Sequence, residues 1–166
     1  MRITLPLLLC LALPAASRAQ GAALTAPDSA VIRTRGAMFA LSVADIDASE
    51  RWYREKLGLS VIMRAAKSPQ TKAAVVVLRG GGLLVELVAH DEAVPLRTVL
   101  PGGRGALHVH GIFKVGVLVD DFDATFAALR ARGVEVAIGP FPKRADQPAN
   151  VIVRDNAGNM IQIVGR

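Results

Sequence analysis

Two stretches of alternating hydrophobic and polar residues open the two halves of the chain. They read FALSVADID (39–47) and VGVLVDDFD (115–123), and they are offset by 76 positions (115 − 39). An alternation with period two predicts strands over Met38–Val43 and Lys114–Val119. The same offset returns further on, where GGGLLVELV faces NAGNMIQIV. The pattern therefore predicts an internal duplication.

A predicted helix follows each of these strands. Asp47 and Glu50 have the spacing of an N-terminal capping box, and Asp123 is the matching N-cap candidate in the second half. The helices are predicted over 48–57 and 124–132. Each is followed by a glycine, Gly58 or Gly133, that suits a left-handed C-terminal cap.

Three strand-like stretches then complete each half. They read LSVIMRA, AAVVVLR and LLVELVA in the first half, and VEVAI, NVIVRD and MIQIVG in the second. The glycines at 80–82 predict a hairpin turn. We therefore predict an α+β fold with two tandem βαβββ modules: module one over 36–90, a linker over 91–110 and module two over 111–166.

The N-terminus has the layout of a secretory signal peptide. Arg2 precedes an apolar run of about eleven residues, which is too short to cross a bilayer. Small residues then lead to a predicted cut after Ala19, so residues 1–19 are removed and 20–35 form a flexible leader. An uncleaved anchor is the alternative. We expect a periplasmic or secreted protein.

Composition narrows the possible partners. Cleavage removes Cys10, the only cysteine, so the mature chain has neither a thiol nor a disulfide. It also removes Arg2 and Arg18, which lowers the formal charge from +6 to +4 (6 − 2). The remaining basic residues are scattered with little aromatic interleaving, so we expect no nucleic-acid partner. No later segment is long and apolar enough to span a membrane, so we expect no membrane partner after cleavage.

Three segments resemble the vicinal oxygen chelate superfamily: MFALSVADIDASERWYREKLGL, KVGVLVDDFDATFAALRARGV and DNAGNMIQIV. That superfamily includes glyoxalases, bleomycin-resistance binders, fosfomycin-modifying enzymes and extradiol dioxygenases. The resemblance covers about residues 36–166. It implies two βαβββ modules whose mixed sheet curls into a ligand-binding cup. In family enzymes a divalent metal is held there by up to four side chains, usually His, Glu or Gln.

Strand alternation indicates which side chains face this cup. The bulkier set, with Phe39, Leu41 and Val43, is expected to pack under the helices. The opposite face gives the predicted ligand-binding residues: Met38, Ala40, Ser42, Leu84, Glu86, Val88, Lys114, Gly116, Leu118, Met160 and Gln162.

By the resemblance, the metal-ligand positions fall on Met38, Glu86, Lys114 and Gln162. A thioether suits hard divalent ions poorly, and the Lys114 ammonium places a positive charge where the cation would lie. We therefore expect no metal and no other cofactor. Lys114 either pairs with Glu86 in the cup, with the Gln162 carbonyl beside it, or extends its charged end to water.

The function predicted from these residues is that of an exported, metal-free small-molecule-binding protein of the bleomycin-resistance type, with a small organic ligand. The alternative is a divergent metal-dependent lyase or dioxygenase, glyoxalase-like, that holds a divalent ion with Glu86, Gln162, His108 and His110. In that case His90 is a conceivable further donor. A structural module with a filled cup is the third class, and a homodimer is left open.

Overall fold

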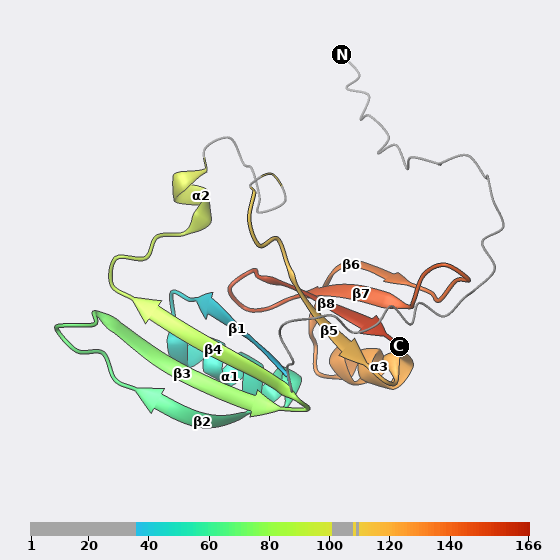
Figure 1. Cartoon of the computed structure of the whole chain (residues 1–166), viewed down its shortest axis with the longest axis horizontal. Coiled ribbons are helices and arrows are strands. Elements are labelled where there is room, and N and C mark those ends of the chain that lie inside the picture. Colours follow the sequence, from blue (N-terminus) through green and yellow to red (C-terminus); the bar gives the residue numbers. More distant parts are fainter. Residues whose placement is uncertain (1–35, 101–107, 109) are drawn as a thin grey trace, which may run out of the picture. The chain divides into compact units, whose positions relative to one another are not determined.

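Two copies of a strand–helix–strand–strand–strand unit follow one another along the chain (Figure 1). The first copy contains β1 (Ala37–Ser42), α1 (Ile46–Leu57), β2 (Ser60–Ala65), β3 (Ala73–Gly80) and β4 (Leu83–His90). The second copy contains β5 (Val115–Val119), α3 (Phe122–Ala131), β6 (Glu135–Phe141), β7 (Asn150–Arg154) and β8 (Met160–Gly165). A single turn of helix that the sequence did not predict, α2 (Leu96–Val99), lies in the linker.

The computed structural model describes residues 36–100, 108 and 110–166. The predicted signal peptide (1–19) and leader (20–35) lie outside the described residues. No helix in the described ranges has the length and hydropathy needed to cross a membrane.

The two modules have the same sheet topology. The strand orders are β1-β4-β3-β2 and β5-β8-β7-β6. The first strand of each module runs parallel to the last, and the remaining pairs are antiparallel. The described residues therefore form two open, four-stranded mixed sheets, which confirms the predicted pair of βαβββ modules.

The helix starts differ from the prediction by two residues. Asp45 and Asp121 are the N-caps, and their side chains accept hydrogen bonds of 2.8 and 2.9 Å from backbone N–H groups three residues further on. Asp47 and Asp123 lie in the first helical turn, where a negative charge favours the helix dipole. Asp45 and Asp121 cap the helices because their backbone is still extended.

Glu50 does not close the predicted capping box. It is 7% exposed, and its carboxylate accepts hydrogen bonds from Arg64 at 2.5 Å and from Arg54 at 3.3 Å. Because Arg64 lies on β2, this ion pair joins α1 to the sheet. At the other end of each helix, Gly58 and Gly133 adopt the predicted left-handed conformation, with φ of 73° and 67°.

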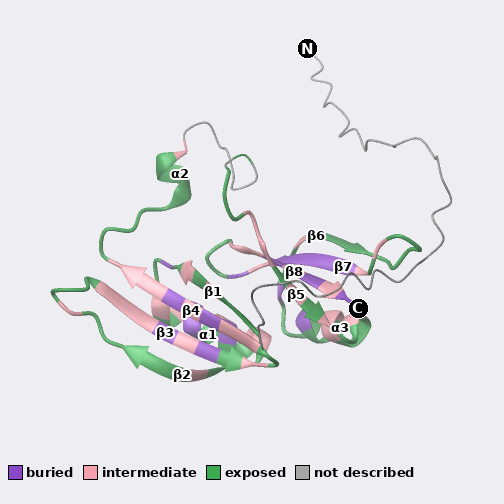
Figure 2. Ribbon diagram, in the orientation of Figure 1, coloured by how far each residue is buried: buried purple, intermediate pink, exposed green. Residues whose placement is uncertain are grey.

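The core lies between each helix and its sheet, and it continues from one module into the other. Figure 2 shows buried residues concentrated on β3, β4, β7 and β8, while the edge strands β2 and β6 are largely exposed. The fully buried side chains include Leu78, Val85, Leu87, Val151, Val153 and Ile161. These residues come from both halves, so neither module completes its core alone.

A polar network holds α1 against the β7–β8 turn. The Tyr53 hydroxyl is fully buried and donates a hydrogen bond of 3.0 Å to Asp155 Oδ2. Asn156 Nδ2 donates to Ser49 Oγ at 3.1 Å beside it. Burial raises the pKa of Tyr53 far above its ordinary value, and the Asp155 charge and hydrogen bond raise it further. Tyr53 therefore joins the modules as a neutral donor.

Lys56 and Arg132 join the modules a second time. Lys56 Nζ donates a hydrogen bond to the Arg132 carbonyl oxygen, and Arg132 Nη1 donates to the Lys56 carbonyl oxygen at 3.1 Å. The two residues are 76 positions apart, which is the offset of the repeat. Each cation therefore satisfies a carbonyl at the end of the other module's helix, where the dipole favours positive charge.

Candidate functional site

Each sheet has one face that its helix does not cover, which we call the open face. In module one, Phe39 and Leu41 pack towards the core, whereas Ala40 and Ser42 on the same strand are exposed. Met38 is 56% exposed. On β4, Val85 and Leu87 are buried, and the intervening residues are half-buried on the open face. The structure thus places the predicted residues of module one on a common open face; they are Met38, Ala40, Ser42, Leu84, Glu86 and Val88.

Glu86 lies at the centre of this face. Its partners in register are Ala40 on β1 and Val77 on β3, and Leu84 and Val88 lie on either side of it along β4. The carboxylate is half-buried, and it has no hydrogen-bond or ion-pair partner within residues 36–100, 108 and 110–166. A carboxylate among apolar neighbours can accept hydrogen bonds from a ligand that carries a donor or a positive charge.

Gln162 occupies the equivalent place in module two. It lies between Gly116 on β5 and Ile152 on β7, and its Nε2 donates a hydrogen bond of 3.0 Å to Asn150 Oδ1. Asn150 Nδ2 in turn donates to the Pro148 carbonyl oxygen at 3.1 Å. These bonds orient the Gln162 amide, so its carbonyl oxygen is held as an acceptor. The other predicted residues on this open face are Leu118 and Met160.

Lys114 is not part of a strand, contrary to the prediction. β5 begins at Val115, and the Lys114 ammonium lies 5.6 Å from the centre of the Phe113 ring. The ion pairs of the described residues do not include Lys114 with Glu86, and the Gln162 amide is bonded to Asn150. The predicted Lys114–Glu86 pair is therefore absent from this structure. The predicted pair required Lys114 to be the first residue of the strand, and sequence alternation does not determine where a strand begins.

The residues at the family's metal-ligand positions do not fit a hard divalent cation. Met38 offers a thioether and Lys114 an ammonium, which leaves only the Glu86 carboxylate and one neutral oxygen, the Gln162 carbonyl. Within the described residues, no three His, Cys, Asp or Glu side chains are grouped so that they could hold a metal ion. Glu86 is therefore the one anionic oxygen donor among the four positions.

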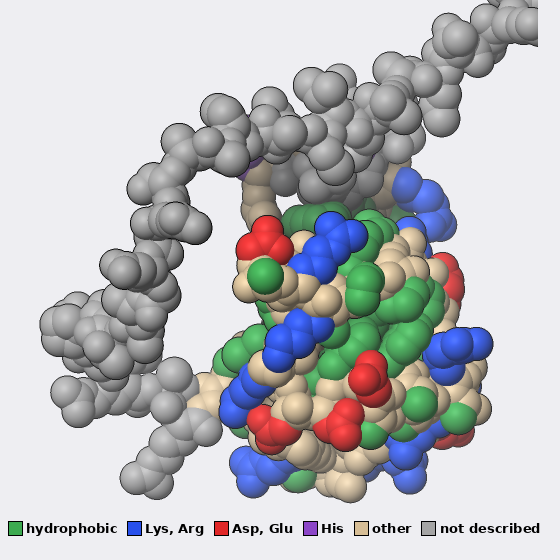
Figure 3. Space-filling model, turned by 90° about the vertical axis from the view of Figure 1, so that its right-hand side faces the viewer, with side chains coloured by type: hydrophobic (Ala, Val, Ile, Leu, Met, Phe, Trp, Pro, Cys, Tyr) green, Lys and Arg blue, Asp and Glu red, His purple; other side chains and the backbone are tan. Residues whose placement is uncertain are grey.

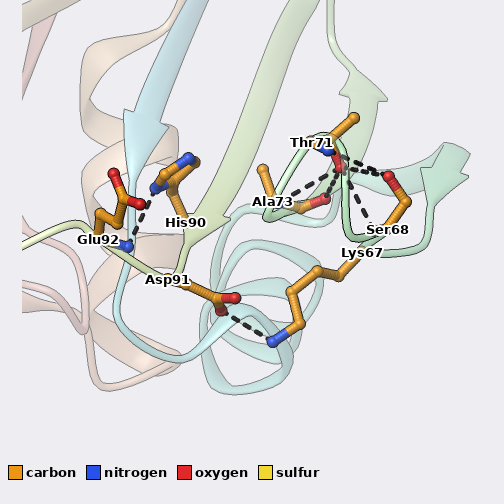
Figure 4. Close-up of polar contacts among 7 residues, drawn as sticks. All are labelled: Lys67, Ser68, Thr71, Ala73, His90, Asp91 and Glu92. Atoms are coloured by element: carbon orange, nitrogen blue, oxygen red, sulfur yellow. Dashed lines mark hydrogen bonds and ion pairs between the residues drawn. The ribbon is translucent and has the colours of Figure 1, made fainter.

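His108 and His110 lie outside the strands of the open faces, whereas His90 ends β4. His108 and His110 are exposed and precede β5, so neither lies on a strand of the second sheet. His90 is the last residue of β4, and its Nδ1 accepts a hydrogen bond of 3.1 Å from the backbone N–H of Glu92 (Figure 4). Beside it, Lys67 forms an ion pair of 2.8 Å with Asp91. These contacts tie the β2–β3 connection to the end of β4.

Asn150 is a residue of the site that the sequence analysis missed. Its signal was present, because an antiparallel turn at DNAGN places residues 150 and 162 on the same face of β7 and β8.

Figure 3 shows one face of the molecule, on which hydrophobic side chains gather between interspersed Lys, Arg, Asp and Glu side chains. Charges of both signs on this face agree with the scattered basic residues of the sequence.

Paired βαβββ modules with open sheet faces define the class of fold, and the sequence identifies the family. The model of the Glyoxalase/Bleomycin resistance protein/Dioxygenase superfamily matches residues 36–163. The chain therefore belongs to this superfamily, as the resemblance predicted. A comparison with curated proteins finds no match.

Solved structures of the same fold include a glyoxalase family protein from Enterococcus faecalis, with a TM-score of 0.59, 18% identity and coverage of 80% of this chain and 96% of that one. A glyoxylase/bleomycin resistance protein/dioxygenase domain from Frankia sp. EAN1pec has a TM-score of 0.61, 18% identity and coverage of 82% and 93%. TnmS3, an antibiotic binding protein from Streptomyces sp. CB03234, has a TM-score of 0.53, 24% identity and coverage of 80% and 96%. At these identities the likeness establishes the fold.

Proposed function

We propose that the protein is an exported, metal-free binder of a small organic molecule, of the bleomycin-resistance type. The observation that carries this proposal is the Glu86 carboxylate, which lies half-buried on an apolar sheet face without a partner in the described part of the chain. Such a group gains a charge-assisted hydrogen bond when a donor of a ligand reaches it. The fold shared with an antibiotic binding protein supports the same class of function.

The residues of the open faces define the ligand's chemistry. Leu84, Val88 and Leu118 offer apolar contact, and Glu86 accepts from an amine or another donor of the ligand. Export rests on the signal-peptide layout that ends at Ala19.

Two measurements test this function. Metal analysis of protein purified without chelator comes first, followed by calorimetric titration with apolar amines and metal-free bleomycin as the first probes. We expect binding without metal. Glu86→Gln should weaken amine binding by about tenfold or more, because a hydrogen bond to a charged acceptor contributes about 1.5–3 kcal/mol.

Glu92→Gln is the matched control. Glu92 is also a glutamate close to β4, but it lies beyond the end of the strand and forms an ion pair of 2.5 Å with Lys72. Loss of the Glu92 charge should therefore leave the affinity for the amine within about twofold of the unchanged protein. Equal affinities for the Glu86→Gln variant and the unchanged protein contradict the proposal. A stoichiometric divalent ion that is lost with Glu86→Gln supports the metal-dependent lyase or dioxygenase instead.

A further inference from the structure

The contact between the modules has two equivalent halves. Residues 76 positions apart occupy equivalent places, as the N-caps Asp45 and Asp121 and the reciprocal pair Lys56 and Arg132 show. In one half, α1 faces the β7–β8 turn. In the other half, α3 faces the β3–β4 turn. The two halves can therefore be compared position by position.

The first half is filled. Tyr53 and Ser49 of α1 are 0% and 1% exposed, and they are hydrogen-bonded to Asp155 and Asn156 of the β7–β8 turn. Trp52 packs edge-on against the Tyr53 ring, with 4.9 Å between the ring centres. Two aromatic rings and a polar network thus occupy this side of the interface.

The second half is hollow. The positions equivalent to Trp52 and Tyr53 hold Ala128 and Leu129, and the position equivalent to Asn156 holds Gly80. All three residues line an open cavity of about 330 Å³ between α3 and the β3–β4 turn. Its room lies beside Ala128, because Leu59 fills the space next to Gly80, where an added Cβ would meet Leu59 Cδ2 at 2.9 Å. A cavity of this size is within the range of small-molecule sites, about 300–1,000 Å³. It lies on the helix side of both sheets, away from the open faces.

The lining of this cavity favours a particular kind of occupant. Leu59, Leu83 and Ile161 are among its apolar side chains, and the charged residues at its edge are the two cations Lys56 and Arg132. No acidic residue is among the described residues that line it. Each cation donates one hydrogen bond to the other's backbone carbonyl, yet an ammonium has three donors and a guanidinium five. Donors therefore remain for an anion.

We propose that this cavity is a second binding site, distinct from the open faces, for a small aromatic carboxylic acid. The flat ring takes the place that Trp52 and Tyr53 fill in the equivalent half, against Ala128 and Leu129. The carboxylate lies at the edge, beside Lys56 and Arg132. The cavity is open to solvent at Ala128, so a flat ring can enter there and cover the apolar side chains that line it.

Titration of the full chain with 2-naphthoate tests this site, with calorimetry for affinity and methyl NMR for location. We expect shifts at the methyl groups of Leu129 and Ile161. Ala128→Phe places a ring in the hollow, so it should weaken naphthoate binding by about tenfold or more. Ala127→Phe is the matched control, since Ala127 is the neighbouring exposed residue of α3 and does not line the cavity; its affinity should stay within about twofold.

The ligand's charge is tested with 2-naphthamide, which has the same ring but is neutral. We expect the acid to bind about five- to tenfold more tightly than the amide, because charge-assisted hydrogen bonds are the stronger ones. Lys56→Met combined with Arg132→Met should remove this preference. A melting temperature of Ala128→Phe at or above that of the unchanged protein shows that the variant is folded.

Four results overturn the proposal. The first is that naphthoate does not bind, or binds Ala128→Phe and Ala127→Phe equally well. The second is that its shifts appear at Leu84 or Leu118 of the open faces. The third is that the acid and the amide bind equally. The fourth is that Glu86→Gln abolishes naphthoate binding, because that substitution changes only the open face of module one.

Discussion

Tyr53→Phe tests whether the buried phenol holds the two modules together. The substitution keeps the ring and removes the hydroxyl that donates at 3.0 Å to Asp155 Oδ2. A hydrogen bond to a charged group contributes about 1.5–3 kcal/mol, so we expect a loss of that size in the free energy of unfolding. With an unfolding entropy of about 2.1 cal/mol/K per residue over about 130 residues, the melting temperature falls by about 5–11 °C.

The pH dependence of this difference has a defined sign. Because the pKa of Tyr53 is raised, the folded state keeps the phenolic proton at pH values where the unfolded chain has lost it. Above the unfolded pKa near 10, the free energy of unfolding therefore falls with pH by about 1.4 kcal/mol per pH unit. Tyr53→Phe has no such dependence. The stabilities of the two proteins should therefore become equal between about pH 11 and pH 12.

Urea unfolding of both proteins from pH 7 to pH 12 measures this convergence. Tyr53 is the only tyrosine of the chain, so tyrosinate absorbance reports its titration without interference. Asp155→Asn is the companion variant: the pKa of Tyr53 should fall but stay above its ordinary value, because burial is the larger cause of the shift. A tyrosine that titrates near pH 10 while the protein is folded, or a variant as stable as the parent at pH 7, refutes the reasoning.

Three further tests, which use five substitutions, probe the helix ends and the buried ion pair. Asp45→Ala should lower the free energy of unfolding in urea by about 1 kcal/mol, whereas Asp47→Ala should cost about half of that or less; equal losses mean that the cap is misassigned. Glu50→Gln should cost about 1–3 kcal/mol, and this loss should persist at high salt because the carboxylate is buried. Lys56→Met and Arg132→Met should each cost about 0.3–1 kcal/mol, and additive losses show that each cation caps a carbonyl independently.

Much of the fold follows from local sequence signals. Alternation along β1 and β4 determined which side chains lie on the open face of module one, because successive side chains of a strand point to opposite sides. The glycines at 58 and 133 determined the helix ends, since they adopt the left-handed conformation at little cost. The duplication itself is a property of the residue order, and it predicted the two equivalent modules.

Only the tertiary structure decided the contacts between distant residues. Tyr53 and Asp155 are 102 positions apart, and no local pattern selects that acceptor. The cavity beside Ala128 lies where α3 meets the β3–β4 turn of the other module, which neither segment reveals alone. β5 begins at Val115, so Lys114 lies outside the strand and does not pair with Glu86. The first residue of a strand depends on its partner strand, which local alternation does not reveal.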